Sequence, residues 1–167
     1  MNTLTPKHAD ESAVETRNLL MPRDANPRGT AFGGLIMSWI DATAAMAATR
    51  HCGAEVVTAA IDSISFRAPI CVGDQVVLRA RVTYTGRTSM EVSVLVVREN
   101  PVTESRETAT TAHLTFVALG EDGKPMPIPP LACSTPEECE ALRKAEKRVI
   151  SRKEHRSRHE AVDWDII

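Results

Sequence analysis

The chain has 167 residues, of which 43% are apolar and 25% charged, so its length and composition are typical of one globular domain with a short tail. Twenty Lys and Arg residues against 22 Asp and Glu residues give a formal net charge of -2, which excludes the strongly basic surface of a typical nucleic-acid-binding protein. An aromatic fraction of 4% argues against a surface that stacks bases. The four cysteines form no CxxC pair and no Cys/His ligand spacing, which predicts reduced thiols in a cytoplasmic protein and no metal site.

Composition divides the chain into four segments. We expect a flexible N-terminus at residues 1–12, a folded domain at 13–120, a proline-rich linker at 121–135, and a charged helix with a tail at 136–160. The polar start of the chain does not resemble a signal peptide. Ser134, Thr135 and Pro136, followed by acidic residues, form a typical helix start.

In chain order, a first strand is expected at residues 13–20, and the least charged segment of the chain follows it. Residues 31–48 are apolar or small almost throughout, with Asp41 as their only charged residue. The length of this segment reaches the lower limit for a helix that spans a membrane. Two glycines at its start, the acid, and many Ala, Thr and Ser residues argue against membrane insertion. A helix that is apolar all round is a buried helix, so we expect other elements to wrap it, and His51 to follow and cap it.

Period-two alternation then predicts four strands, at residues 56–66, 76–84, 90–97 and 112–118. Gly86 and Arg87 form a hairpin turn between two of them, and a shift of apolar parity between Ile61 and Ile64 predicts a bulge. The predicted fold class is therefore α+β, an antiparallel sheet of five to six strands around one long helix. One such sheet leaves the far side of the helix uncovered, so we expect dimerisation through sheet edges or helices.

The start and the middle of the long helix carry candidate chemistry. Gly33 and Gly34 leave first-turn N–H groups open to a ligand and favour a developing oxyanion, although two glycines alone are better explained by ordinary helix capping and close packing. Asp41 has no Lys or Arg three or four residues away, and a lone carboxylate on a buried helix is costly unless it is paired or functional. A hydrogen bond to Ser38 is the structural alternative. We favour Asp41 as a general base.

The spacing of Gly34 and Asp41 adds a geometric constraint. Seven residues of helix separate them by about 10 Å, at ~1.5 Å per residue. One substrate carbonyl does not easily reach both groups of a single helix. If both groups act on one carbonyl, they come from two chains, which predicts an active site shared across a dimer interface.

Five segments together carry a resemblance to a known family. They are residues 24–34 (Asp-Ala-Asn-Pro-Arg-Gly-Thr-Ala-Phe-Gly-Gly), 37–41 (Met-Ser-Trp-Ile-Asp), 57–62, 72–74 and 86–91. In this order they resemble the hot-dog-fold acyl-CoA thioesterases, the YciA-like and cytosolic brain-type acyl-CoA hydrolases, over roughly residues 13–155. The resemblance implies a hot-dog fold, a two-helix dimer with a continuous sheet, and a hexamer built as a trimer of dimers.

The same resemblance implies roles for individual residues in the hydrolysis of acyl-CoA to free fatty acid and CoA. Asp41 acts as general base or nucleophile, Asn26 from the facing subunit positions the water or the thioester, and the N–H of Gly34 polarises the carbonyl. The residues implied to bind CoA are Ala59, Ala60, Ile61, Arg87, Thr88, Ser89, Met90 and Arg148. No metal or cofactor is implied, CoA being part of the substrate and the product, and neither nucleic acid nor membrane insertion is expected.

Other functions stay open at this point. A non-catalytic acyl-CoA-binding regulator on the same fold would bind acyl-CoA without releasing a thiol. An anion-binding protein would depend on the basic stretch at residues 143–158. A hot-dog dehydratase is less favoured, because the sequence shows no catalytic His beside the helix start.

Overall fold

The computed structural model describes residues 4–159, and its contacts fall into two units, Met1–Ala132 and Cys133–Ile167. Residues 1–3 of the predicted N-terminus and residue 160 of the predicted tail lie outside the described residues. None of the described helices combines the length and apolarity needed to cross a membrane.

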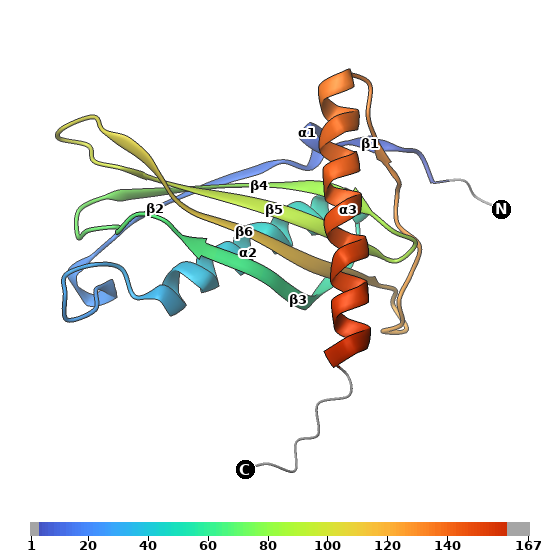
Figure 1. Cartoon of the computed structure of the whole chain (residues 1–167), viewed down its shortest axis with the longest axis horizontal. Helices are drawn as coiled ribbons and strands as arrows, with labels where there is room; N and C mark the ends of the chain where they lie inside the picture. The colour runs from blue at the N-terminus through green and yellow to red at the C-terminus, as the bar shows by residue number, and fades with distance from the viewer. Residues whose placement is uncertain (1–3, 160–167) are drawn as a thin grey trace, which may run out of the picture. The chain divides into compact units, whose positions relative to one another are not determined.

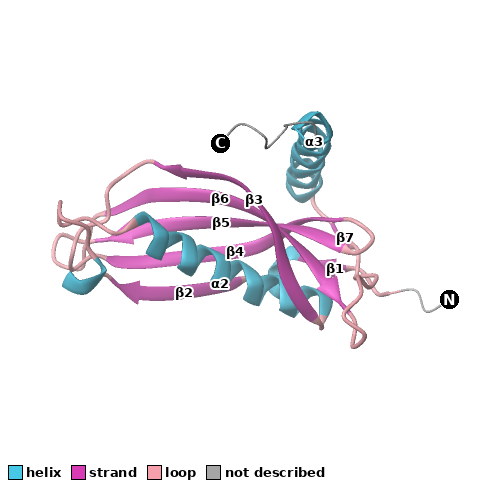
Figure 2. Ribbon diagram, turned by 90° about the horizontal axis from the view of Figure 1, so that it is seen from below, coloured by secondary structure: helices cyan, strands magenta, loops and turns pink. Residues whose placement is uncertain are grey.

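The first unit is a five-stranded antiparallel sheet with one long helix along one face (Figures 1 and 2). The strand order is β2-β4-β5-β6-β3, so β2 and β3 form the two edges. The bounds are β2 Val14–Leu19, α2 Gly33–Cys52, β3 Glu55–Phe66, β4 Gln75–Thr85, β5 Ser89–Glu99 and β6 Arg106–Leu119. The predicted order of one strand, a long helix and four strands is confirmed, and so is the α+β class.

Four short elements surround this frame and were not predicted. They are β1 Lys7–His8, α1 Ala9–Ser12, the 3-10 turn η1 Pro22–Asp24, and β7 Leu131–Ala132, with β1 and β7 paired in parallel. Elements of two to four residues are too short to show a helical or strand period in the sequence.

The core lies between the sheet and α2, because alternate strand residues face the helix. Leu78 and Leu114 on this face are fully buried, whereas Arg79 on the opposite face is exposed. The helix contributes Ile36 and Ile40, followed by the small residues Ala44, Ala47 and Ala48, all buried. These small side chains let the helix lie close to the strands, which keeps the interior densely packed.

One side of α2 remains uncovered within the chain. Met37, Ala42 and Met46 of the helix are exposed, together with Ile61 and Phe66 of the edge strand β3. We call these five residues the open face. Within a single chain the five strands cover only one side of the helix, which is the shortage of cover that the sequence predicts.

Strand β3 is irregular where the parity shift predicted a bulge. Its register with β6 shifts between Thr58 and Ala60 and again between Ile61 and Ser63. The second shift confirms the prediction. The first leaves Ala59 outside the paired ladder, on a strand whose other edge has no neighbour in the sheet.

His51 is placed differently from the prediction. It lies inside the last turn of α2, fully buried, while Gly53 ends the helix in the left-handed conformation with φ 69°. The ring Nε2–H donates to the carbonyl of Pro129 at 3.0 Å, and Nδ1 accepts from the Ser12 hydroxyl at 3.3 Å. The proposed capping role is wrong because Gly53 adopts the left-handed C-cap more easily than any side chain.

The second unit contains α3, Pro136–His159, which begins where the sequence predicts. Its Thr135 hydroxyl accepts from the Glu138 amide at 3.2 Å, an ordinary helix cap. Cys133 and Cys139 form a disulfide across this helix start, with Cα atoms 5.2 Å apart. The expectation of four reduced thiols is wrong for this pair, because the helix start brings two cysteines six residues apart within bonding distance. Cys52 and Cys71 are free.

The buried His51 makes fold stability depend on pH. Burial lowers the pKa of His51 below its usual value, aided by the nearby Lys7, against the opposing effect of the Pro129 carbonyl. In the unfolded chain His51 titrates at about pH 6.5, so below this pH the unfolded state binds more protons than the folded state. The free energy of unfolding should therefore fall as the pH drops below about 6.5. Urea unfolding between about pH 8 and pH 5 should show a shallower pH dependence for His51→Gln, and an equal dependence would contradict this assignment.

Candidate active site

Asp41 lies at the middle of α2 and is half-buried, facing β3. The Thr58 hydroxyl donates a hydrogen bond to Asp41 Oδ1 at 2.7 Å. Ser38, the alternative partner considered from the sequence, makes no such bond in the part of the chain that the structure describes. The carboxylate is thus held by the edge strand, and its Oδ2 accepts no hydrogen bond within residues 4–159.

Thr58 is a candidate site residue that the sequence analysis did not single out. It lies within the motif segment 57–62, but threonine is so common in strands that its presence there carries no signal. Only the packing of β3 against α2 shows that the Thr58 hydroxyl faces the Asp41 carboxylate. The bulge predicted in this strand lies between Ile61 and Ser63, so it did not mark Thr58 in advance.

The surroundings of Asp41 are largely apolar. Met37 lies one helical turn before it on the same side of α2, and Ile61 lies on the helix-facing side of β3. Both belong to the open face and are 40% and 46% exposed. A carboxylate at the border of an apolar surface loses water as soon as a second surface covers it, and a charged group there needs a functional or structural reason.

The start of α2 offers hydrogen-bond donors beside a cavity. Gly33 and Gly34 occupy the first turn, where amides have no carbonyl of the helix itself to donate to. A cavity of about 340 Å³ adjoins Gly33 and is also lined by Phe66, Arg67 and Ile70. A Cβ at Gly34 would lie 2.5 Å from Cε1 of Phe32, so glycine lets this ring lie against the helix start. This geometry suits an anionic or polarised oxygen.

Asn26 is fixed within the loop that precedes α2. Its Oδ1 accepts from the Arg28 amide at 2.9 Å, its Nδ2 donates to the Thr30 hydroxyl at 2.9 Å, and its amide donates to the Thr30 carbonyl at 2.7 Å. Gly29, with φ 75°, closes this turn. Within residues 4–159 of one chain, no hydrogen bond joins Asn26 to Asp41.

The residues expected to bind CoA fall in three places. Ala59, Ala60 and Ile61 lie on the edge strand β3, and Arg87, Thr88 and Ser89 lie at the turn between β4 and β5, where Arg87 is exposed. Met90 is only 1% exposed and belongs to the core, so a contact to a ligand would have to come from its main chain. Arg148 lies on α3, in the unit that begins at Cys133.

Among residues 4–159, no three His, Cys, Asp or Glu side chains come together as a metal site would require. The expectation that neither metal nor cofactor is needed stays a prediction.

Sequence comparison finds relatives over most of the chain. The family model described as Thioesterase superfamily matches residues 28–105. The uncharacterized acyl-CoA thioester hydrolase YkhA of Bacillus subtilis is 43% identical over 159 residues, which span 95% of this chain and 92% of that protein.

Solved structures show the same fold. An apo-hexameric acyl-CoA thioesterase is 39% identical with a TM-score of 0.86, covering 96% of this chain and 100% of that one. An acyl-CoA hydrolase from Staphylococcus aureus, in complex with butyryl coenzyme A and coenzyme A, is 37% identical with a TM-score of 0.86, covering 92% and 94%. Variants of that hydrolase in which an aspartate, an asparagine or a threonine is replaced by alanine have TM-scores of 0.87, 0.89 and 0.83.

Proposed function

Because this chain belongs to the hot-dog thioesterase superfamily, we propose that it hydrolyses acyl-CoA thioesters to a carboxylic acid and free CoA. The observation that carries the proposal is Asp41, a carboxylate held by Thr58 at 2.7 Å beside an apolar open face. The similarity to YkhA and to the S. aureus hydrolase over more than nine-tenths of the chain supports it.

Hydrolysis needs a base and a polarised carbonyl, and the chain offers groups for both. Asp41 takes a proton from water as the water oxygen attacks the thioester carbon. The carbonyl oxygen becomes an oxyanion that accepts the amide N–H of Gly34. The C–S bond then breaks. The CoA sulfur leaves with the electron pair of this bond and takes up a proton. Direct attack by Asp41, followed by hydrolysis of the acyl-enzyme, uses the same residues.

The groups of one site come from two copies of the chain. Gly34 and Asp41 of one helix are about 10 Å apart, at ~1.5 Å per residue, so one carbonyl meets Gly34 of one copy and Asp41 of another. The open face and the free edge of β3 give a second copy both apolar area and unpaired strand groups to cover. The hexameric neighbour supports further assembly into a trimer of dimers.

The spacing of the catalytic residues gives independent support. In the S. aureus variants, the substituted asparagine, aspartate and threonine follow each other with the same order and spacing as Asn26, Asp41 and Thr58 here. We assign Asn26 of the facing subunit to position the water or the thioester. Thr58 orients Asp41 by occupying Oδ1 and leaving Oδ2 for the water.

CoA itself is assigned to the remaining residues. Its pantetheine lies along the main chain of Ala59, Ala60 and Ile61 at the β3 edge. Its phosphates lie near the exposed Arg87, with hydroxyl donors from Thr88 and Ser89, because charge-assisted hydrogen bonds suit phosphate oxygens. Arg148 is assigned to the nucleotide phosphate, and a cytoplasmic pool of acyl-CoA is the proposed setting.

Release of free CoA thiol from acyl-CoAs of several chain lengths tests the activity. We expect turnover by the parent protein and a loss of about 10²–10⁴-fold in kcat/KM for Asp41→Asn, because a general base contributes that much. Circular dichroism and size-exclusion chromatography check that the variant stays folded and assembled. Binding of acyl-CoA without thiol release at any chain length would overturn the proposal and favour the acyl-CoA-binding regulator.

Mixed dimers test whether the site is shared. Asp41→Asn and Asn26→Ala chains should each be nearly inactive, but unfolding and refolding them together should restore about a quarter of the parental activity, since each mixed dimer of a two-fold pair keeps one intact site. The control mixes Asp41→Asn with the chain carrying both substitutions, which restores nothing. Mixed dimers that form without recovering activity would contradict a shared site.

Thr58 provides a matched pair of variants. Thr58→Val keeps the shape of the side chain and removes the hydrogen bond to Asp41, so kcat should fall about tenfold, the equivalent of one hydrogen bond to a charged group. Thr58→Ser keeps the hydroxyl and should retain most of the activity. Equal kcat values for the two variants in the thiol-release assay would show that the hydroxyl has no role.

A further inference from the structure

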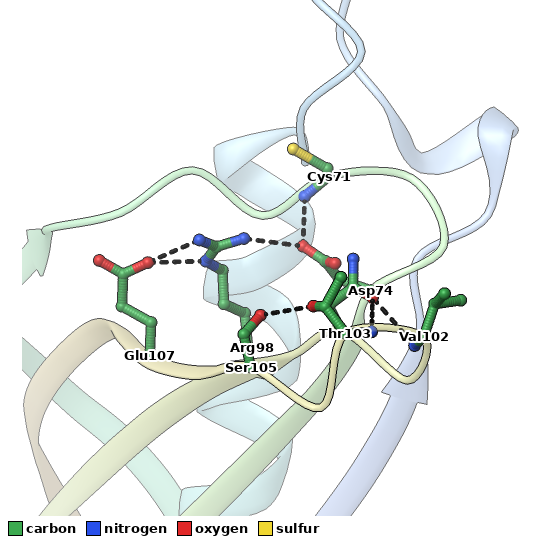
Figure 3. Close-up of polar contacts among 8 residues, drawn as sticks. Cys71, Asp74, Arg98, Val102, Thr103, Ser105 and Glu107 are labelled. Carbon is green, nitrogen blue, oxygen red and sulfur yellow. Dashed lines mark hydrogen bonds and ion pairs between the residues drawn. The ribbon is translucent and has the colours of Figure 1, made fainter.

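A polar network joins the ends of three strands around Asp74 (Figure 3). Asp74 is only 2% exposed, and its Oδ2 accepts from the Cys71 amide at 2.8 Å. The same oxygen lies 3.6 Å from Nη1 of Arg98, near the end of β5. Arg98 also donates from Nε and Nη2 to one oxygen of Glu107 on β6, at 2.9 and 2.6 Å. We call these three charged residues the Asp74 network.

The turn between β5 and β6 fixes the strand end that carries Arg98. Asn100 Oδ1 accepts from the amides of Val102 and Thr103 at 3.0 and 3.1 Å, and the hydroxyls of Thr103 and Ser105 lie 3.0 Å apart. Glu107 and Asp74 hold the pKa of Arg98 above its usual value, so its guanidinium stays charged. The buried Asp74 carboxylate thus has a fixed cationic partner, without which burial would be costly.

The network ends at the loop that carries Asn26. The segment at residues 70–72 pairs with that loop: the Ala31 amide donates to the Ile70 carbonyl at 2.8 Å, and Thr30 forms a β-bridge with Cys71. Thr30 is also the residue that accepts from both the amide and the side chain of Asn26. A continuous series of contacts therefore leads from Arg98 through Asp74, the Cys71 amide and Thr30 to Asn26.

We propose that Arg98, acting through Asp74, is a positioning residue that fixes the loop carrying Asn26 for thioester hydrolysis. This inference rests on the proposed function, in which Asn26 serves the site of the facing subunit. A loop residue can position a water or a thioester only if its own backbone is fixed, since a displacement of about 1 Å is enough to lower the rate markedly. The loop that carries Asn26 gains this rigidity by pairing with the turn at residues 71–74. Arg98 holds that turn through the buried carboxylate of Asp74.

A double-mutant cycle on kcat and KM tests the role. In the thiol-release assay, Arg98→Met should lower kcat about tenfold with a smaller change in KM, because the lost contact acts on positioning. Arg98→Lys keeps the charge opposite Asp74 and should recover part of kcat. In the Asn26→Ala background, Arg98→Met should have little further effect, since its target is already gone. Equal fold-changes in both backgrounds would overturn the inference.

Two further variants distinguish a positioning effect from misfolding and from a general effect on the two strands. If Arg98→Met does not fold, Asp74→Asn replaces it, because it can still accept from the Cys71 amide while losing the charge that pairs with Arg98. The matched control is Arg106→Met. It removes the 3.1 Å ion pair between Arg106 and Glu99, which joins the same two strands but does not contact the turn at residues 71–74. The control should keep its kcat, and a loss equal to that of Arg98→Met would overturn the inference.

Amide hydrogen exchange gives a readout that needs no turnover. In Arg98→Met, the amides of Thr30 and Ala31 should exchange faster, while those of the central strand β5 stay protected. Unchanged exchange in the loop would overturn the positioning role whatever the activity. If the parent protein hydrolyses acyl-CoA and needs Asn26, but the effects of Arg98→Met and Asn26→Ala are additive, this inference alone is overturned. A parent that hydrolyses no acyl-CoA would overturn the proposed function as well.

Discussion

The burial of α2 is the constraint on which the rest of this structure depends. A helix whose only charged residue between Gly33 and Thr49 is Asp41 has to lose its contact with water, and one five-stranded sheet removes that contact on only one side. The strands therefore bury Ile36, Ile40 and Ala44, while Ala42 and Met46 remain at the surface. The same requirement makes the free edge of β3 and the exposed side of the helix parts of one apolar surface.

The proposed chemistry follows from the position of this surface. Asp41 lies at its border, where β3 supplies Thr58, whereas Gly34 lies in the first turn of the same helix and Asn26 in the loop before it. In the proposed mechanism, a single chain thus carries parts of two sites, and neither part is complete without a second copy. Pairing of two copies would bury the apolar side chains and complete the site in one step, so assembly and catalysis would have the same structural basis.

Much of this could be predicted from the sequence, and the failures have physical reasons. The strands, the β3 bulge and the start of α3 were predicted because period-two alternation and capping residues are local signals. The Asp41–Thr58 pair and the Asp74 network were not, because they join residues far apart in the chain. The disulfide was missed because Cys133 and Cys139 match no familiar spacing, and His51 was misplaced because the end of a helix depends on Gly53. The roles given to Asn26, Asp41 and the CoA-binding residues remain predictions.

The uncovered side of α2 also bears on how the chain exists in dilute solution. If two copies must meet to shield the helix, folding and association form one equilibrium, and the apparent stability depends on protein concentration. The midpoint of thermal unfolding would then rise with concentration, and specific activity would decline on dilution without any damage to the polypeptide. A newly synthesised chain would depend on encountering another copy before its exposed edge strand meets an unrelated one.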